Sequence, residues 1–359
     1  MQYFLGIDVG GSKAEVAIFR IDGTLISTGR YDNGLSLADE PRDTPFRVGA
    51  GRGIHSIHKA LELAFITADF PEDEVVDLTI TMHMGSFPIP LLAGINLGAI
   101  TVKYATEFSP VFELAGVKYA AFSLAGTGAS TFCVLPDGRS MSMDGAGPDL
   151  GDLGGGCYIG KRALTAVLKS IWHERYDTSL KEAIPKALGF KQLAPKEINH
   201  YEELVQYSLR PHDRAYIAGI ARIVAEEAAK GDRVATELLI DASDQLSETL
   251  SLVVDRLNCT DMELPLITMG SLLAKSDIYW DNFISRVKDF APNFIPMRTV
   301  ISPSVGNALS GMRKICPKEY NDFLREKVLE NSKDMIFTTE APIERREAFY
   351  ERRRHHYYD

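Results

Sequence analysis

The alternation of apolar and polar positions divides this chain into short strands and longer helices. Short apolar runs bounded by turn residues predict strands, here at residues 3–7, 14–21, 24–29, 76–82, 99–103 and 264–269. Apolar residues that recur every three or four positions predict helices, here at residues 54–68, 108–114, 160–173, 212–230, 233–257 and 279–290. Because strands and helices alternate along the chain, the pattern predicts an α/β fold.

The first two predicted strands are joined by a glycine turn that carries an acidic residue. The chain reads Asp8-Val-Gly-Gly-Ser-Lys13 between two apolar segments, and the second segment ends at Asp22-Gly23. Glycine contributes no side-chain packing, so the adjacent Gly10 and Gly11 indicate either a tight turn or a ligand that the backbone itself must approach.

This layout occurs a second time. Another apolar strand runs into Gly126-Thr127-Gly128 and then into a strand that ends at Asp137-Gly138. The Asp-Gly pairs that close the two hairpins lie 115 residues apart. Such a repeat predicts two related domains that open with the same hairpin. Successive amides in a turn can bind an anion, so both turns are candidate phosphate sites; the alternative is that both are ordinary hairpin turns.

Length and composition narrow the class of protein. A chain of 359 residues predicts more than one domain. The net charge of −10 argues against nonspecific binding to nucleic acid or to an anionic membrane. No apolar run approaches the roughly 20 residues of a membrane helix. The four cysteines form no Cys-x-x-Cys pair, which favours reduced thiols in a cytoplasmic protein over a disulfide framework, a zinc site or an iron–sulfur cluster.

Several segments, taken in chain order, resemble one known family. They are Asp8–Lys13, Leu124–Ser130, Gly147–Gly160, Leu266–Leu273 and Pro303–Ser310. Together they resemble the phosphate, adenosine and closing-helix motifs of the BadF/BadG/BcrA/BcrD ATPase and N-acetylglucosamine kinase-like family, which belongs to the acetate-kinase/hsp70/actin superfamily.

The resemblance implies two ribonuclease-H-like domains, as in actin-like ATPases, around a nucleotide cleft that binds ATP and Mg²⁺. The first domain would span residues 1–117. The second would span residues 118–312, and its last helix could pack on the first domain. Residues 313–359 would form a C-terminal extension.

The resemblance also implies roles for individual residues. Asp8 would hold Mg²⁺, and Asp152, a candidate catalytic residue, would sit near the metal or the acceptor. The other implied ligands are Gly10, Gly11, Ser12 and Lys13 around the β- and γ-phosphates, Gly126, Thr127 and Gly128 opposite them, and Gly270 and Ser271 behind the adenosine. This set suits phosphoryl transfer, which needs positioning and charge neutralisation more than covalent help.

The acceptor side departs from the family pattern. Sugar kinases of the family carry Asn-Asp-Ala after the strand that matches residues 100–104, and the Asp is the base for the sugar hydroxyl. This chain has Thr106-Glu-Phe-Ser-Pro110 there. Glu107 is therefore the candidate base, and the alternative is that it stabilises the N-terminus of the helix that follows.

The sequence thus predicts an ATP-dependent kinase that acts on a small hydroxylated substrate, most simply a sugar or amino sugar. The alternative is a BadF-type ATPase that couples hydrolysis to a conformational change for a protein partner, without an iron–sulfur cluster. An actin-like structural protein is a third, weaker interpretation.

Residues 344–354 predict a charged helix within the extension. One interpretation is a solvated helix. The other is that Phe349, Tyr350, Tyr357 and Tyr358 dock on a second subunit and form a homodimer.

Overall fold

The chain folds into two compact units. Met1–Val117 and Ile301–Asp359 form the first unit, and Lys118–Val300 form the second. The structure, a computed structural model, describes residues 1–10, 13–32, 48–68, 70, 74–83, 95–106, 108–190, 201–209 and 214–354.

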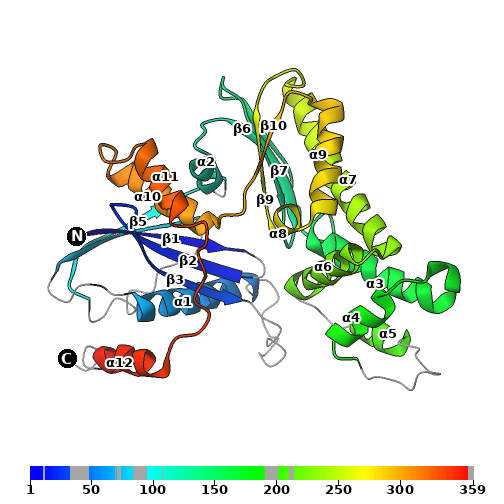
Figure 1. Ribbon diagram of the computed structural model, residues 1–359, viewed down its shortest axis with the longest axis horizontal. Coiled ribbons are helices and arrows are strands. Elements are labelled where there is room, and N and C mark those ends of the chain that lie inside the picture. Colours follow the sequence, from blue (N-terminus) through cyan, green and yellow to red (C-terminus); the bar gives the residue numbers. More distant parts are fainter. Residues whose placement is uncertain are drawn as a thin grey trace. The chain divides into compact units, whose positions relative to one another are not determined.

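The first unit is built on a five-stranded sheet with the strand order β3-β2-β1-β4-β5 (Figure 1). The antiparallel part consists of β1 (Gln2–Val9), β2 (Lys13–Arg20) and β3 (Leu25–Asp32). β4 (Val76–Met82) runs parallel to β1, and β5 (Leu97–Tyr104) runs parallel to β4. A meander followed by two parallel strands agrees with the ribonuclease-H-like domain that the sequence motifs imply.

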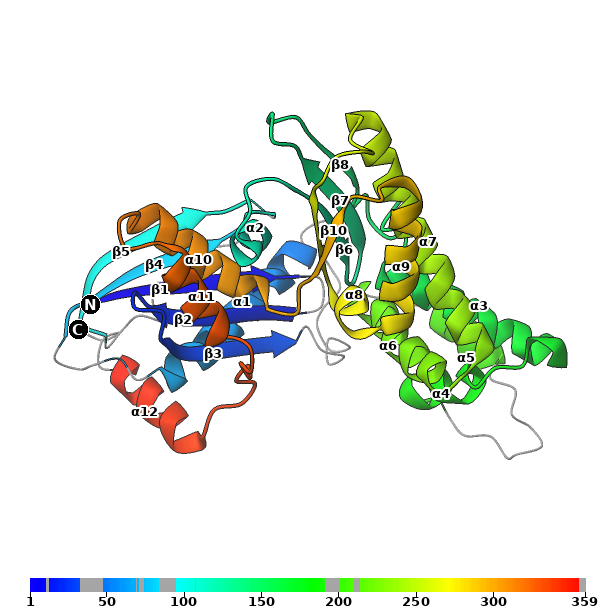
Figure 2. The ribbon, with the colours of Figure 1, turned by 45° about the horizontal axis from the view of Figure 1, so that its top comes forward.

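Helices cover both faces of this sheet. The helix α1 (Val48–Thr67) lies on one face. The other face carries α2 (Ser109–Ala115), α10 (Pro303–Ile315) and α11 (Asp322–Glu330). Figure 2 shows α10 and α11 above the strands. Each face buries its own apolar cluster, so the sheet is the middle layer of a three-layer unit.

Glycines let two of these helices approach the strands closely. A Cβ atom at Gly6 of β1 would overlap the carbonyl of Ser304 in α10, and a Cβ at Gly29 of β3 would overlap the carbonyl of Ala60 in α1. Residues 301–312 group with the first unit because α10 packs on β1 and on α2.

The second unit repeats the sheet. Its strand order is β10-β9-β6-β7-β8, which is the order of the first sheet written from the other edge. Its strands are β6 (Ala120–Ala125), β7 (Ala129–Val134), β8 (Ser140–Asp144), β9 (Pro265–Met269) and β10 (Ile295–Arg298). β6, β7 and β8 are antiparallel, whereas β9 is parallel to β6 and β10 to β9. The repeated hairpin in the sequence therefore corresponds to a repeated sheet topology, and the predicted α/β class with two such domains is confirmed.

The second unit contains more helix than the first. Its α-helices are α3 (Gly156–Trp172), α4 (Leu180–Ala187), α5 (Tyr201–Leu209), α6 (Arg214–Ala229), α7 (Arg233–Leu257), α8 (Ser271–Lys275) and α9 (Asp277–Phe290). α7 packs on β7 and β8, and α9 packs on α7 (Figure 2). One apolar cluster joins these helices to the sheet.

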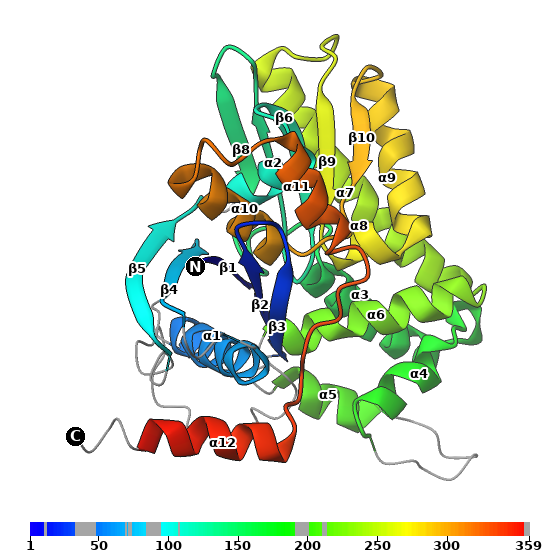
Figure 3. The same cartoon turned by 60° about the vertical axis from the view of Figure 1, so that its left-hand side comes forward.

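The C-terminal extension packs on the first unit. Its last helix, α12 (Ile343–Arg354), lies beside α1 (Figure 3). Phe349 is only 5% exposed and belongs to the apolar cluster between α1 and the sheet. The prediction that Phe349 docks on a second subunit is therefore wrong, because its own chain already buries the ring. Tyr350 is 38% exposed, and Tyr357 and Tyr358 lie outside the described residues.

Most predicted elements lie close to the observed ones, and the largest shift has a simple cause. The helix expected from residue 54 begins at Val48. Three glycines, at positions 49, 51 and 53, precede the apolar repeat. Glycine has low helix propensity, so the sequence pattern gave no sign of the first turns.

Candidate active site

The first candidate phosphate loop joins β1 to β2. The N–H of Gly10 donates to the carbonyl of Lys13 at 2.8 Å and closes the turn. Among the described atoms, a Cβ at Gly10 would have only the Lys13 carbonyl near it, at 4.0 Å, so described packing does not require glycine there. Gly11 and Ser12 lie outside the described residues. Their expected role as phosphate ligands stays a prediction.

Asp8 lies near the carboxyl end of β1 and is half-buried. In the register of the hairpin it lies opposite Glu15 of β2. A carboxylate at this position is a suitable Mg²⁺ ligand, because Mg²⁺ binds through one or two protein carboxylates and otherwise keeps water or phosphate oxygens. Within the described ranges, no group of three or more His, Cys, Asp or Glu side chains could form an all-protein metal site.

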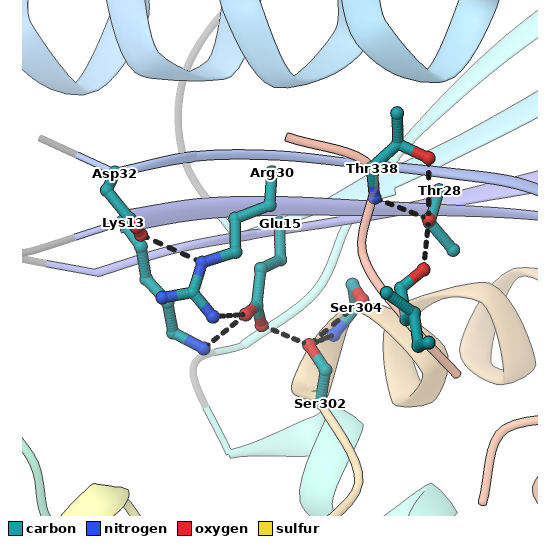
Figure 4. Close-up of polar contacts among 9 residues, drawn as sticks. Lys13, Glu15, Thr28, Arg30, Asp32, Ser302, Ser304 and Thr338 are labelled. Carbon is teal, nitrogen blue, oxygen red and sulfur yellow. Dashed lines mark hydrogen bonds and ion pairs between the residues drawn. The ribbon is translucent and has the colours of Figure 1, made fainter. Parts of the chain in front are cut away.

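Lys13 starts β2, and its side chain is 35% exposed. Its ammonium group forms an ion pair with Glu15 at 2.5 Å, as Figure 4 shows. An ammonium group has three donors, so one bond to Glu15 leaves two for a phosphate. Lys13 can therefore serve as a phosphate ligand while it stays paired.

The second candidate loop, Gly126 to Gly128, joins β6 to β7 and rests on the start of α3. The N–H of Gly156 donates to the Gly126 carbonyl at 2.8 Å, and the N–H of Cys157 donates to the Thr127 carbonyl at 3.0 Å. The loop carbonyls thus pair with the first amides of the helix. In the part of the chain that the structure describes, no acceptor pairs with the N–H groups of Thr127 and Gly128. These two amides are the donors that an anion-binding turn needs.

The glycines around this loop serve different purposes. A Cβ at Gly128 would meet the Asp152 carboxylate at 2.5 Å. Gly270, with φ of 102°, faces the carbonyl of Ala125, and a side chain there would collide with it. A Cβ at Gly126, in contrast, would meet no described atom within 4 Å. Packing therefore explains Gly128 and Gly270, whereas Gly126 leaves open space beside the loop.

We expect Gly126→Val to weaken ATP binding by about tenfold or more without unfolding the protein, because the added side chain would occupy the space that phosphate oxygens need. Calorimetry with a nonhydrolysable ATP analogue measures this affinity. Gly219→Val is the matched control, since Gly219 of α6 also has no described atom within 4 Å of a built Cβ. Equal affinities for the two variants would contradict a phosphate site at this loop.

Gly270 and Ser271 are brought next to the loop by the sheet. β9, which ends just before Gly270, runs parallel to β6, which ends just before Gly126. Ser271 begins the short helix α8. The structure therefore places Gly270 beside the second candidate loop, followed directly by Ser271, while contact of these residues with adenosine stays a prediction.

Asp152 lies beneath the loop and is 3% exposed. Its backbone has φ of 55°, and its carboxylate accepts a long hydrogen bond from the N–H of Ala129 at 3.4 Å. Such burial suits a residue that supports the loop, and its expected catalytic role stays a prediction. Glu107, the other candidate catalytic acid, lies outside the described residues.

Asp144 is a further residue of the candidate site, and the sequence motifs did not indicate it. Its carboxylate accepts hydrogen bonds from the N–H groups of Asp152, at 2.6 Å, and Leu153, at 2.7 Å. It therefore shapes the segment that carries Asp152. The signal in the sequence is the Asp144-Gly145 pair, a typical turn dipeptide, directly before the glycine-rich segment.

Two curated kinases align with most of this chain. The chain is 26% identical over 325 residues to an N-acetyl-D-glucosamine kinase of Dictyostelium discoideum, covering 86% of this chain and 97% of the relative. It is also 26% identical over 295 residues to an N-acetylmuramic acid/N-acetylglucosamine kinase of Clostridium acetobutylicum, covering 79% and 89%. No family model matches the chain.

Solved structures share the fold. A candidate N-acetylglucosamine kinase from Chromobacterium violaceum superposes with a TM-score of 0.58 at 19% identity, covering 87% of this chain and 99% of the other. A second, from Porphyromonas gingivalis, gives a TM-score of 0.52 at 17% identity with the same coverage. These comparisons confirm the family resemblance that the motifs indicated.

Proposed function

We propose that this chain, which belongs to the BadF/BadG/BcrA/BcrD ATPase and N-acetylglucosamine kinase-like family, is an ATP-dependent sugar kinase. It would transfer the γ-phosphoryl group of ATP to a hydroxyl group of a small sugar, with N-acetylglucosamine as the first acceptor to test. The observation that carries the proposal is the loop at residues 126–128, with two amides available to a phosphate and open space at Gly126. The alignment with two kinases of amino sugars, over most of each chain, supports the choice of acceptor.

The residues of the two candidate loops suit the binding of a nucleoside triphosphate. Backbone amides of Thr127 and Gly128 would bind phosphate oxygens, and Lys13 would neutralise part of their charge. Asp8 would hold Mg²⁺, which when bound neutralises charge on the phosphates. Gly270 and Ser271 would support the adenosine.

The acceptor hydroxyl must lose its proton during transfer. Glu107 would take that proton, and the carboxylate would have to lie about 3 Å from the hydroxyl and be ionised at the working pH. The position follows from the order of motifs along the chain, since Glu107 stands after β5 where the family's sugar kinases have their base.

We expect ADP release to depend on the sugar. The purified full chain is supplied with Mg-ATP and one acceptor at a time: N-acetylglucosamine, N-acetylmuramic acid, glucose or none. Release of ADP is followed by a coupled assay, and the phosphorylated sugar is identified by mass spectrometry. Stimulation by an amino sugar of at least about tenfold over the acceptor-free rate is the expected result.

The same assay separates the competing activities. Slow hydrolysis that no acceptor changes would contradict the kinase and favour an ATPase that serves a protein partner. Sedimentation of the same sample with and without ATP would reveal filaments or a homodimer. The homodimer, Mg²⁺ as the metal and a cytoplasmic location stay predictions. Among the described residues, no helix is long and apolar enough to cross a membrane.

A further inference from the structure

A buried carboxylate lies on β2, two residues after Lys13 of the first candidate phosphate loop. Glu15 of β2 is 2% exposed and faces three partners (Figure 4). Lys13 contacts its Oε1 atom at 2.5 Å, Arg30 contacts the same atom at 3.2 Å, and the Ser302 hydroxyl donates to Oε2 at 2.7 Å. A buried charge is costly unless it is paired and hydrogen-bonded, and Glu15 satisfies both conditions.

The position of Glu15 in the sheet explains why it needs two cations. It lies opposite Asp8 on β1 and opposite Arg30 on β3. Like charges directly opposite one another destabilise an antiparallel pair. Lys13 and Arg30 offset the charge of Glu15 in this row of the sheet.

The second sheet lacks this charged row. By strand order, β6 and β7 correspond to β1 and β2. There the buried residues Ser123 and Thr131 lie opposite one another and carry neutral hydroxyl groups. A buried neutral pair thus occurs in the corresponding hairpin, which favours a role for the charged row that is specific to the first loop.

Arg30 is itself held in place. Its Nε atom donates to Asp32 at 2.8 Å, and its backbone N–H donates at 2.8 Å to Thr338 of the C-terminal extension. Ser302 is fixed as well, since it forms the N-cap of α10 and accepts from the N–H of Ser304. Three separate segments of the chain therefore fix the Glu15 carboxylate.

We propose that Glu15 is a positioning residue of the phosphate site, which holds the Lys13 ammonium group in place for the nucleotide. A free lysine side chain has many rotamers, and ordering it costs free energy when phosphate binds. Glu15 orders the side chain beforehand and leaves two ammonium donors for phosphate oxygens. This role of Glu15 rests on the proposed kinase function, but it can be tested by measuring nucleotide binding alone.

The test is a double-mutant cycle with Lys13→Met, Glu15→Gln and the double variant. Affinity for a nonhydrolysable ATP analogue with Mg²⁺ is measured by calorimetry on the full chain. We expect Lys13→Met to weaken binding about tenfold, as for loss of one charged hydrogen bond. Glu15→Gln should weaken it roughly threefold to tenfold, and the double variant should match Lys13→Met within about a factor of two.

Glu113→Gln is the matched control. Glu113 of α2 is also buried in the first unit, at 6% exposed, and it pairs with Arg313 and accepts from the Tyr320 hydroxyl. Thermal unfolding of both Gln variants measures the structural cost of losing a buried carboxylate. Glu113→Gln should lower the melting temperature while leaving nucleotide affinity unchanged.

Three results would overturn the inference. The first is that the effects of Lys13→Met and Glu15→Gln on affinity are independent and multiply in the double variant. The second is that Glu15→Gln raises the affinity. The third is that Glu113→Gln loses as much affinity as Glu15→Gln. Each of these could occur in an enzyme that phosphorylates sugars, so the positioning role can fail while the kinase stands. Conversely, the double-mutant cycle can give the expected coupling between Lys13 and Glu15 even if no sugar stimulates ADP release. In that case only the proposed kinase function would fail.

Discussion

Replacing Asp8 by Ala should reduce Mg²⁺-dependent turnover by about 10²-fold or more while the protein stays folded. A metal ion contributes several kcal/mol to stabilising transferred phosphoryl charge, and each 1.36 kcal/mol corresponds to a factor of ten in rate. Asp8 is only half-buried at the end of β1, so its carboxylate contributes little to the core. The rate is measured with the sugar that the acceptor screen identifies.

Asp22→Ala provides the control for Asp8→Ala. Asp22 lies in the turn that follows β2, at the other end of this strand from Lys13. It pairs there with Arg20, and its side chain is 43% exposed. Losing this surface ion pair should change stability by less than about 1 kcal/mol and leave turnover unchanged. A folded Asp8→Ala protein with the turnover of Asp22→Ala would refute the assignment of Asp8 to Mg²⁺.

The second large effect is expected for Glu107→Gln. Glutamine keeps the shape of the side chain and its hydrogen-bonding capacity but cannot accept the proton of a sugar hydroxyl. Loss of a general base costs about 10²-fold or more in turnover. Affinity for ATP should stay close to that of the wild type, because the residues proposed to bind the nucleotide are on other loops. Steady-state kinetics and calorimetry on the same preparation give both quantities.

A structural role for Glu107 predicts a different result. Helix α2 begins at Ser109, and the Ser109 N–H already pairs with the Thr106 hydroxyl at 3.1 Å. If Glu107 only supports this helix, the Gln variant should lose stability and retain phosphorylation within a factor of about three. Asp152→Asn would then be the next variant to test, and a loss of ATP affinity in that variant would indicate support of the loop rather than acid–base catalysis.

The sequence alone determined the fold class and the positions of the two glycine loops that we propose bind phosphate. The spacing of apolar residues in strands and helices is a local property of the sequence. The bounds of β4 and α7 are therefore the ones that this spacing predicted. The repeated glycine hairpin also predicted that one fold occurs twice, and the two sheets share one strand order. A turn that needs glycine is encoded within a few neighbouring residues, which is why both loops could be recognised before any tertiary contact was known.

The tertiary structure decided which side chains meet. Glu15 and Ser302 lie 287 residues apart in sequence and form one hydrogen bond. The burial of Phe349 against the cluster of α1 likewise depends on how the extension returns to the first unit. Gly128 is required because the Asp152 carboxylate lies against it. Periodicity indicates which face of an element is buried. The residues that pack on that face depend on long-range contacts, which the local sequence pattern does not identify.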